Sequence, residues 1–355
     1  MVQSQLFPAS IIGSMPRPDF VKDLISDDCP FSDEDRQRWM RAAIRSVVAL
    51  QEAAGLDIVS DGEWWRKSYI GVIAELAHGF ELSLNPADGR PWTVVVDRLA
   101  AKSPGFIAQE VTFLKTLTNR QIKATLPAPA LLGERMWDPE ASKKAYPTRE
   151  AFVQDCVPIL RREIELLRSE GVAVVQVDDP HLCLFVDEDV RRGYDNPDQA
   201  ADFAVDMNNQ VVADFDDVKL AVHLCRRAGA RARGDAQHQG GFEVIMPQLR
   251  KLNVGHITME FTSPGSGEMA VLRELKEDVE IGLGCVSCLP GEIDSVQTIV
   301  DRVKQAIQFV APERITLNPE CGFAPGSAAK VSIDEVYTKL KNEVAAARQL
   351  RLEYS

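Results

Sequence analysis

Four side chains of the kinds that bind soft metal ions lie at the ends of short apolar segments. His223 and Cys225 occur in VHLC, Glu260 in TMEF and Cys321 in NPECG. Residues two apart on a strand point to the same side, so His223 and Cys225 can bind one ion together. Imidazole, thiolate and carboxylate ligands suit Zn²⁺, and a site whose shell is completed by substrate is catalytic. The four residues together predict a zinc ion that holds a thiolate, although a His-x-Cys pair alone more often belongs to a core.

These segments belong to a series of β-branched runs that alternate with amphipathic stretches. Such alternation is typical of parallel strands joined by crossover helices. The expected strands are 10–14, 57–61, 122–127, 173–179, 219–225, 256–262, 280–286 and 314–321. The expected helices include 33–54, 149–170, 197–215, 295–310 and 333–351. Eight such units predict an α/β fold of the (β/α)₈ TIM-barrel type, whose strand ends converge on one face. A doubly wound open sheet is the alternative, but no strand is followed by GxGxxG.

One region interrupts the alternation. From about residue 80 to 118, the segments FELSLN, TVVVDRL and EVTFLKTL read as extended chain, and residues 85–89 have turn chemistry. We interpret this region as an antiparallel β flap inserted between the second and third barrel strands. The remainder contains no repeat or linker, so residues 1–355 are expected to form a single barrel domain.

Composition excludes several classes of partner. The 355 residues carry a formal net charge of -13, which disfavours binding to nucleic acid or an anionic membrane surface. No apolar run approaches the ~20 residues of a membrane helix, and the N-terminus lacks the pattern of a secretory signal. We therefore expect a cytoplasmic protein. Seven cysteines in a chain of this length are not typical of a disulfide framework, so we expect reduced thiols that can serve in metal binding or catalysis.

The motifs, taken in order, resemble those of the catalytic barrel of cobalamin-independent methionine synthase, and especially its single-barrel bacterial and archaeal relatives. The matching segments are IIGSMPRP, DIVSDGE, QVDDP, VHLCR, TMEF and NPECG. The resemblance implies that zinc is bound by His223, Cys225, Glu260 and Cys321. It also implies that this zinc activates the thiol of homocysteine, which takes a methyl group from 5-methyltetrahydrofolate to give methionine. Bound Zn²⁺ lowers a thiol pKa, so the nucleophilic thiolate exists at neutral pH.

The resemblance also implies an amino-acid pocket. Its carboxylate end maps onto Ile12, Gly13 and Ser14. Its ammonium end maps onto Glu63 and Asp178, which also end expected strands, where paired carboxylates suit a small cation. Helix capping, or ion pairs with Arg17 or Arg66, is the competing interpretation. Arg17 itself could bind a carboxylate, phosphate or sulfonate.

The loop after the seventh strand departs from the family pattern. Methionine synthases of the family carry a histidine there, thought to deliver a proton, whereas residues 284–292 contain none. The leaving amine needs general acid assistance, so we consider His181 and His238 as replacements. The competing interpretation is that both are solvated loop histidines. Cys285 and Cys288 could form a redox pair or a metal half-site, but they lack the setting of either.

The alkyl donor is left open. Trp64, Trp65 and Trp137 could stack on a flat donor or pack a lid. Basic residues that could attract an anionic tail follow the zinc segment: Arg226, Arg227, Arg231 and Arg233. A related hypothesis keeps the zinc chemistry but uses another thiol, such as coenzyme M, with an epoxide or a methylated small molecule. A zinc-free decarboxylase and a non-enzymatic binding protein fit the residues less well. Partners are expected to be small molecules, with a homo-oligomer possible.

Overall fold

A computed structural model describes residues 5–84, 91–226, 238–263, 265, 267–324 and 331–354. Its centre is a curled parallel sheet of seven strands in the order β1-β4-β5-β6-β7-β8-β9. The strands are β1 (Ile58–Val59), β4 (Gln121–Pro127), β5 (Val174–Asp178), β6 (Lys219–Leu224), β7 (His256–Glu260), β8 (Glu280–Val286) and β9 (Ile315–Pro319). Every neighbouring pair in this sheet is parallel. Seven of the eight expected strands are therefore confirmed as strands of one sheet.

The segment expected as the first strand behaves differently. It makes two isolated parallel bridges, Ala9 to Leu317 of β9 and Ser10 to Ile58 of β1, and so joins the two edges of the sheet. The amide of Ser10 donates to Leu317 O at 3.0 Å, and the amide of Asp57 donates to Ala9 O at 3.0 Å.

Residues 11–13 do not continue as a strand because side chains from neighbouring strands occupy their carbonyl groups. Lys123 Nζ donates to Ile11 O at 2.6 Å, and Gln176 Nε2 donates to Ile12 O at 3.2 Å. Ser60 Oγ donates to Gly13 O at 2.8 Å. The chain is thereby positioned where a ladder of backbone hydrogen bonds would otherwise run.

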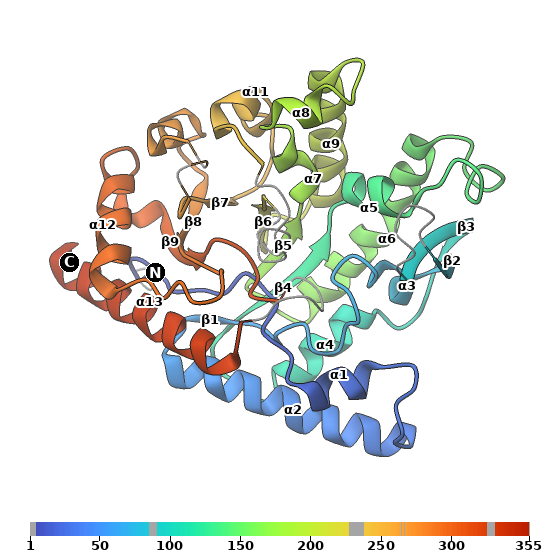
Figure 1. Cartoon of the computed structure of the whole chain (residues 1–355), viewed down its shortest axis with the longest axis horizontal. Coiled ribbons are helices and arrows are strands. Elements are labelled where there is room, and N and C mark those ends of the chain that lie inside the picture. Colours follow the sequence, from blue (N-terminus) through green and yellow to red (C-terminus); the bar gives the residue numbers. More distant parts are fainter. Residues whose placement is uncertain are drawn as a thin grey trace.

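Helices cover the outside of the sheet (Figure 1). The longer ones are α1 (Asp19–Ile25), α2 (Asp33–Ala54), α4 (Phe106–Leu114), α5 (Pro129–Met136), α6 (Arg149–Ser169), α9 (Pro197–Val212), α12 (Val296–Ile307) and α13 (Ile333–Tyr354). Shorter helices are α3 (Ile73–Leu76), α7 (Pro180–Leu184), α8 (Glu188–Arg191) and α11 (Met246–Leu249), with 3-10 turns at Phe242–Ile245, Met269–Glu274 and Pro312–Arg314. The five expected helices are confirmed to within a few residues at their ends. None of the helices that the structure describes combines the length and apolar character needed to cross a bilayer.

Local signals explain where these helices begin and end. The side chains of Ser32, Thr148, Asn196 and Ser295 accept a backbone N–H at the start of α2, α6, α9 and α12. Helix α2 ends at Gly55, whose φ of 95° lies in the left-handed region that glycine adopts without a steric penalty. The buried side chains of each helix recur at three- and four-residue steps and face the sheet.

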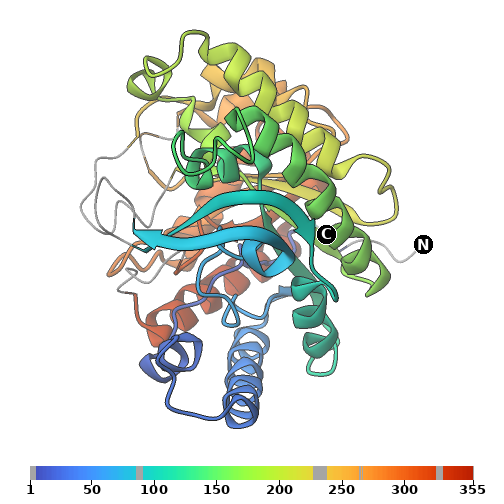
Figure 2. The same ribbon diagram turned by 90° about the vertical axis from the view of Figure 1, so that its right-hand side faces the viewer.

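Two antiparallel strands, β2 (Ala77–Leu84) and β3 (Pro91–Ala101), form a separate hairpin. They come between β1 and β4 in the chain, and the hairpin lies across the side of the molecule that faces the viewer in Figure 2. The expectation of a third extended segment, EVTFLKTL, is wrong. Most of it lies in α4, where Ile107, Val111 and Leu114 are buried at helical spacing. This burial outweighs the strand propensity of its β-branched residues.

Candidate metal and thiol site

Three of the four predicted metal ligands lie together at the carboxyl ends of the strands. His223 belongs to β6, Cys225 follows the end of β6, and Cys321 follows the end of β9. The two Sγ atoms are 2.9 Å apart, and the ligand atoms of all three residues lie within 4.8 Å of one another. All three side chains are buried. One imidazole and two thiols in this arrangement fit a zinc ion with an open position.

The orientation of His223 supports this assignment. Its Nδ1 lies 2.9 Å from Asp178 Oδ1, and Gln176 Nε2 donates to the same oxygen at 2.8 Å. Its Nε2 is buried and has no hydrogen-bond partner among the described residues. A histidine that binds a metal through one ring nitrogen commonly donates from the other to a carboxylate. Burial lowers the pKa of His223, but Asp178 more than offsets this, so the net change is an increase.

Glu260 is fully buried at the end of β7, but it does not belong to the group of ligand atoms that lie within 4.8 Å of one another. Its Oε1 accepts a hydrogen bond from the backbone N–H of Arg226 at 2.7 Å. This contact joins the end of β7 to the chain just after Cys225. Its role as a fourth ligand stays a prediction.

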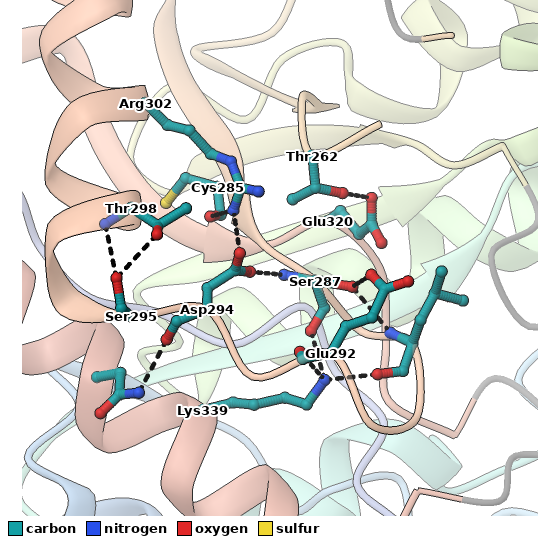
Figure 3. Close-up of polar contacts among 12 residues, drawn as sticks. Thr262, Cys285, Ser287, Glu292, Asp294, Ser295, Thr298, Arg302, Glu320 and Lys339 are labelled. Atoms are coloured by element: carbon teal, nitrogen blue, oxygen red, sulfur yellow. Dashed lines mark hydrogen bonds and ion pairs between the residues drawn. The ribbon is translucent and has the colours of Figure 1, made fainter. Parts of the chain in front are cut away.

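The loop after β8 is held in place by a buried lysine and a half-buried ion pair (Figure 3). Lys339 Nζ donates to the carbonyls of Ser287, Leu289 and Glu292 at 2.9, 2.6 and 2.7 Å. Asp294 Oδ2 accepts from the Ser287 amide at 2.7 Å, and Arg302 pairs with Asp294 at 2.7 Å. This network fixes the loop of residues 284–292, whose sequence contains no histidine.

The two cysteines of that loop turn to different partners. Cys285 Sγ donates to Asn318 O at 3.7 Å, whereas Cys288 Sγ lies 3.6 Å from Glu320 Oε1. Side-chain hydrogen bonds with Cys225 and Cys288 raise the pKa of Cys321, and burial adds to this increase. Cys288 is therefore a neighbour of the metal candidates, while Cys285 belongs to the core.

A small pocket opens beside the three ligands. It is lined by Ile12, Ser14, Glu63, Tyr69, Asp178, Pro180, His223, Cys225, Cys321 and Gly322. Four of the six residues predicted for the amino-acid pocket line it. Gly13 lies directly behind: a Cβ on Gly13 would come within 2.6 Å of Glu63 Oε1. The absence of a side chain at Gly13 leaves the space that the Glu63 carboxylate occupies.

Glu63 is held in an unusual backbone conformation. Its φ is 59°, which is rare for a residue with a side chain and costs of the order of 1 kcal/mol or more. Thr125 Oγ1 donates to Glu63 Oε1 at 2.8 Å and thereby fixes the carboxylate in the pocket. Burial raises the pKa of Glu63, and the nearby Asp178 carboxylate raises it further, whereas Arg66 lowers it. A cation bound between the two carboxylates would stabilise both as anions.

Two arginines support the Glu63 loop from behind. Arg66 is buried and contacts Glu110 through Nη2 at 2.7 Å and through Nε at 3.1 Å. Its Nη1 donates to the carbonyl and hydroxyl oxygens of Thr125 at 2.9 and 3.0 Å. Arg17 Nη2 donates to the carbonyls of Glu63 and Arg66 at 2.6 and 3.1 Å. Arg17 is not among the residues that line the pocket, so the structure places it as a brace for the loop.

The two candidate acids do not line the pocket either. His181 follows Pro180 but faces a separate cavity of about 320 Å³, where its ring packs 5.2 Å from the ring of Phe185. Burial, with the charges of Arg149 and Arg135, lowers the pKa of His181 to about 4. His238 Nδ1 lies 3.2 Å from Asp187 Oδ2.

The proposed aromatic and basic donor contacts are dispersed. Trp64 is buried and donates to Met15 O at 3.3 Å, and Trp137 donates to Tyr146 O at 3.0 Å. The Arg226 guanidinium donates to Gly240 O at 2.6 Å and lies 4.6 Å from the ring centroid of Phe242. Arg227, Arg231 and Arg233 lie outside the described residues.

Sequence reasoning did not identify Tyr69 as a pocket residue or Thr125 as the hydrogen-bond partner of the Glu63 carboxylate. Thr125 lies near the end of β4, and its place beside the other strand ends was the available signal. Tyr69 follows the D-G-E motif by six residues in irregular chain, where no periodicity indicates its direction.

Comparisons with known proteins identify the family of this chain. Residues 7–349 match the family model of the cobalamin-independent synthase catalytic domain. A methionine synthase of Pyrococcus horikoshii is 26% identical over 358 residues, covering 98% of this chain and 94% of that protein. Among solved structures, a B12-independent methionine synthase from Shewanella sp. W3-18-1 in complex with selenomethionine superimposes with a TM-score of 0.80 at 22% identity, covering 98% of both chains. A putative vitamin-B12 independent methionine synthase from Listeria monocytogenes gives a TM-score of 0.74 at 21% identity, over 98% of this chain and 99% of that one. This chain belongs to the family of the cobalamin-independent methionine synthase catalytic domain.

Proposed function

We propose that the protein is a zinc-dependent S-methyltransferase that methylates homocysteine to methionine, with a 5-methyltetrahydrofolate as the default donor. The observation that carries the proposal is the His223, Cys225 and Cys321 cluster at the wall of a pocket that also contains Glu63 and Asp178. The names of its relatives, such as the methionine synthase of Pyrococcus horikoshii, support the reaction class. Glu260 is proposed as a further ligand from the end of β7.

Zinc bound by these ligands would supply a Lewis acid that keeps the substrate thiol ionised at neutral pH. The protein's own residues orient the other end of the substrate. Glu63 and Asp178 would accept hydrogen bonds from its ammonium group, while Ser14 with the backbone of Ile12 and Gly13 would hold its carboxylate. Asp178 also holds the His223 ring by its Nδ1, so one carboxylate serves both the metal ligand and the substrate.

Delivery of a proton to the leaving amine is assigned to His181 or His238. Each must reach the pocket from its present position, since neither lines it. Arg17 is proposed to act on the substrate through Glu63, whose carbonyl it binds.

The two carboxylates of the pocket support homocysteine over the alternative thiol. Coenzyme M carries a sulfonate, and the carboxylates of Glu63 and Asp178 would repel that group across a buried pocket. The ammonium of homocysteine is instead attracted to both carboxylates. This favours the amino-acid thiol over zinc-dependent alkylation of coenzyme M.

The fold proposed for this activity is a closed (β/α)₈ barrel in one domain, residues 1–355. We propose that Ala9 and Ser10 serve as its eighth strand, because they bridge both edges of the sheet. The β2–β3 hairpin is then the flap inserted between the second and third strands, within the expected region of about 80–118. A homo-oligomer is a further proposal.

Purified protein loaded with zinc tests the reaction. We expect methionine to form from homocysteine with 5-methyltetrahydrofolate or another methyl donor from a panel, and the Cys321→Ser variant to lose bound zinc and activity together. Failure to form methionine with any donor, in protein that retains stoichiometric zinc, would reject homocysteine methylation. The same zinc-loaded protein offered coenzyme M provides the comparison with the alternative substrate.

A further inference from the structure

Another cavity, larger than the thiol pocket, lies between α1, α2 and α4. Its volume is about 400 Å³, and it shares no lining residue with the thiol pocket. Figure 1 shows the three helices together in the lower part of the view. Cavities of about 300–1,000 Å³ are of the size that binds small molecules. The function proposed above does not use this cavity.

The cavity wall has an aromatic side. The rings of Trp65 and Phe113 meet edge to face with centroids 6.1 Å apart, and Phe106 also lines the wall. The indole Nε1 of Trp65 is buried and has no hydrogen-bond partner in the part of the chain that the structure describes. A buried N–H without a partner costs about 1–3 kcal/mol, which an acceptor atom of a bound molecule would recover.

The cavity lining also carries cations. Arg36 and Arg41 project from successive turns of α2, and the Arg41 guanidinium lies 4.8 Å from the centroid of the Phe113 ring. Asp33 and Glu110 are the acidic residues of the lining. Glu110 is already paired with Arg66 on both of its carboxylate oxygens, so its charge is offset within the protein. The remaining charge of the lining favours an anion.

We propose that this cavity binds a planar aromatic molecule that carries an acidic group. The ring lies against Trp65 and Phe113, an acceptor atom takes the Trp65 N–H, and the acidic group meets Arg36 and Arg41. Aromatic stacking and charge-assisted hydrogen bonds to arginine then act on the two ends of one ligand.

The floor of the cavity is connected to the Glu63 loop. Glu110 lines the cavity and pairs with Arg66, which donates to Thr125, and Thr125 donates to the Glu63 carboxylate. Trp65 lies between Glu63 and Arg66 in the sequence. Ligand binding that shifts Trp65 or Glu110 therefore also shifts a group of the thiol pocket. This connection, which rests on the proposed function, makes the cavity a regulatory site for thiol binding.

The test of the site uses 1-naphthoate as the probe and 1-naphthalenemethanol as its uncharged match, each titrated calorimetrically into the full chain. We expect naphthoate to bind with a Kd in the millimolar range or below, and the alcohol to bind at least fivefold more weakly. The Arg36→Gln/Arg41→Gln double variant should lose this preference, and Trp65→Phe should weaken both ligands. Arg38→Gln is the matched control, because Arg38 is on the same helix but does not line the cavity.

No binding of naphthoate, or binding that is unchanged in both Trp65→Phe and the double arginine variant, would overturn the site. Circular dichroism and the Tm of each variant establish whether it is folded. If the double arginine variant does not fold, Trp65→Phe, which is the smaller change, serves as the test. The connection is tested separately by measuring the homocysteine Kd of zinc-loaded protein with and without naphthoate. A severalfold change is expected, and an unchanged Kd would overturn the regulatory role. Failure of homocysteine to bind in either condition would count against the proposed function, while the naphthoate titration would still decide the site.

Discussion

The Asp178→Asn variant tests whether the carboxylate behind His223 positions a metal ligand. Asp178 Oδ1 lies 2.9 Å from His223 Nδ1, and the other ring nitrogen is buried without a partner among the described residues. The asparagine keeps the shape of the side chain and one oxygen acceptor but removes the negative charge. His223 then becomes a weaker electron donor, and its ring orientation is less restricted.

The expected loss can be estimated from this geometry. Removing the carboxylate partner of a metal-bound histidine typically lowers metal affinity by about 10–100-fold, or ~1.4–2.7 kcal/mol. Because Gln176 Nε2 can still donate to an asparagine oxygen, we expect a value near the lower end of this range. The ligand set itself is unchanged, so the stoichiometry should remain one metal ion per chain.

Competition for Zn²⁺ against a chromophoric chelator measures this affinity. Asp187→Asn is the control, because Asp187 interacts with His238, away from the cluster. The His223→Gln variant should lose more affinity than Asp178→Asn, since it removes the ligand. A zinc affinity of Asp178→Asn within twofold of the parent protein would refute the role of Asp178 in orienting His223.

Three further predictions concern the surroundings of the site. Gly13→Ala places a Cβ about 2.6 Å from Glu63 Oε1. We expect this to displace the carboxylate and to weaken homocysteine binding in a calorimetric titration, while the zinc content stays unchanged. Homocysteine binding equal to that of the parent protein would contradict this prediction. Lys339→Met leaves three loop carbonyls without their donor. The free energy of unfolding in urea should therefore fall by about 3–5 kcal/mol. A loss below about 1 kcal/mol would show that other contacts hold the loop. The pKa of His181 is lowered to about 4 in the folded chain, against about 6.5 in the unfolded chain. Between these two pH values the unfolded state binds more protons than the folded state. The free energy of unfolding should therefore fall as the pH drops from about 6.5 to 4, by up to ~3 kcal/mol. His181→Gln should flatten that part of the stability profile of the metal-free protein, and an unaltered slope would exclude His181 as its source.

The sequence predicted the parts of the site that depend on strand ends. His223 and Cys225 are two residues apart at the end of β6, and Cys321 follows the end of β9, so parallel strands in one sheet bring them together. The placement of these three ligands required only the order of the elements and the direction of the strands. Glu63 and Asp178 were instead located through the resemblance to the family motifs, with which their expected positions at strand ends agreed.

Other features depend on contacts between residues far apart in the chain. The hydrogen bonds from Lys123 and Gln176 that occupy the carbonyls of residues 11 and 12 follow from packing inside the sheet, which no local pattern reveals. The direction of His181 is a similar case, because Pro180 faces the thiol pocket while the next side chain faces another cavity. The helical state of residues 110–114 was missed because the periodic burial of α4 begins upstream, at Ile107.

The proposed zinc site would bind the metal through the cluster and leave one position for an external thiol. X-ray absorption spectroscopy at the zinc edge, on protein with and without homocysteine, counts the sulfur ligands of the metal. We expect two sulfur ligands, from Cys225 and Cys321, in the free protein, and a third sulfur at about 2.3 Å when homocysteine is added. A sulfur count that stays at two in the presence of saturating homocysteine would contradict this expectation.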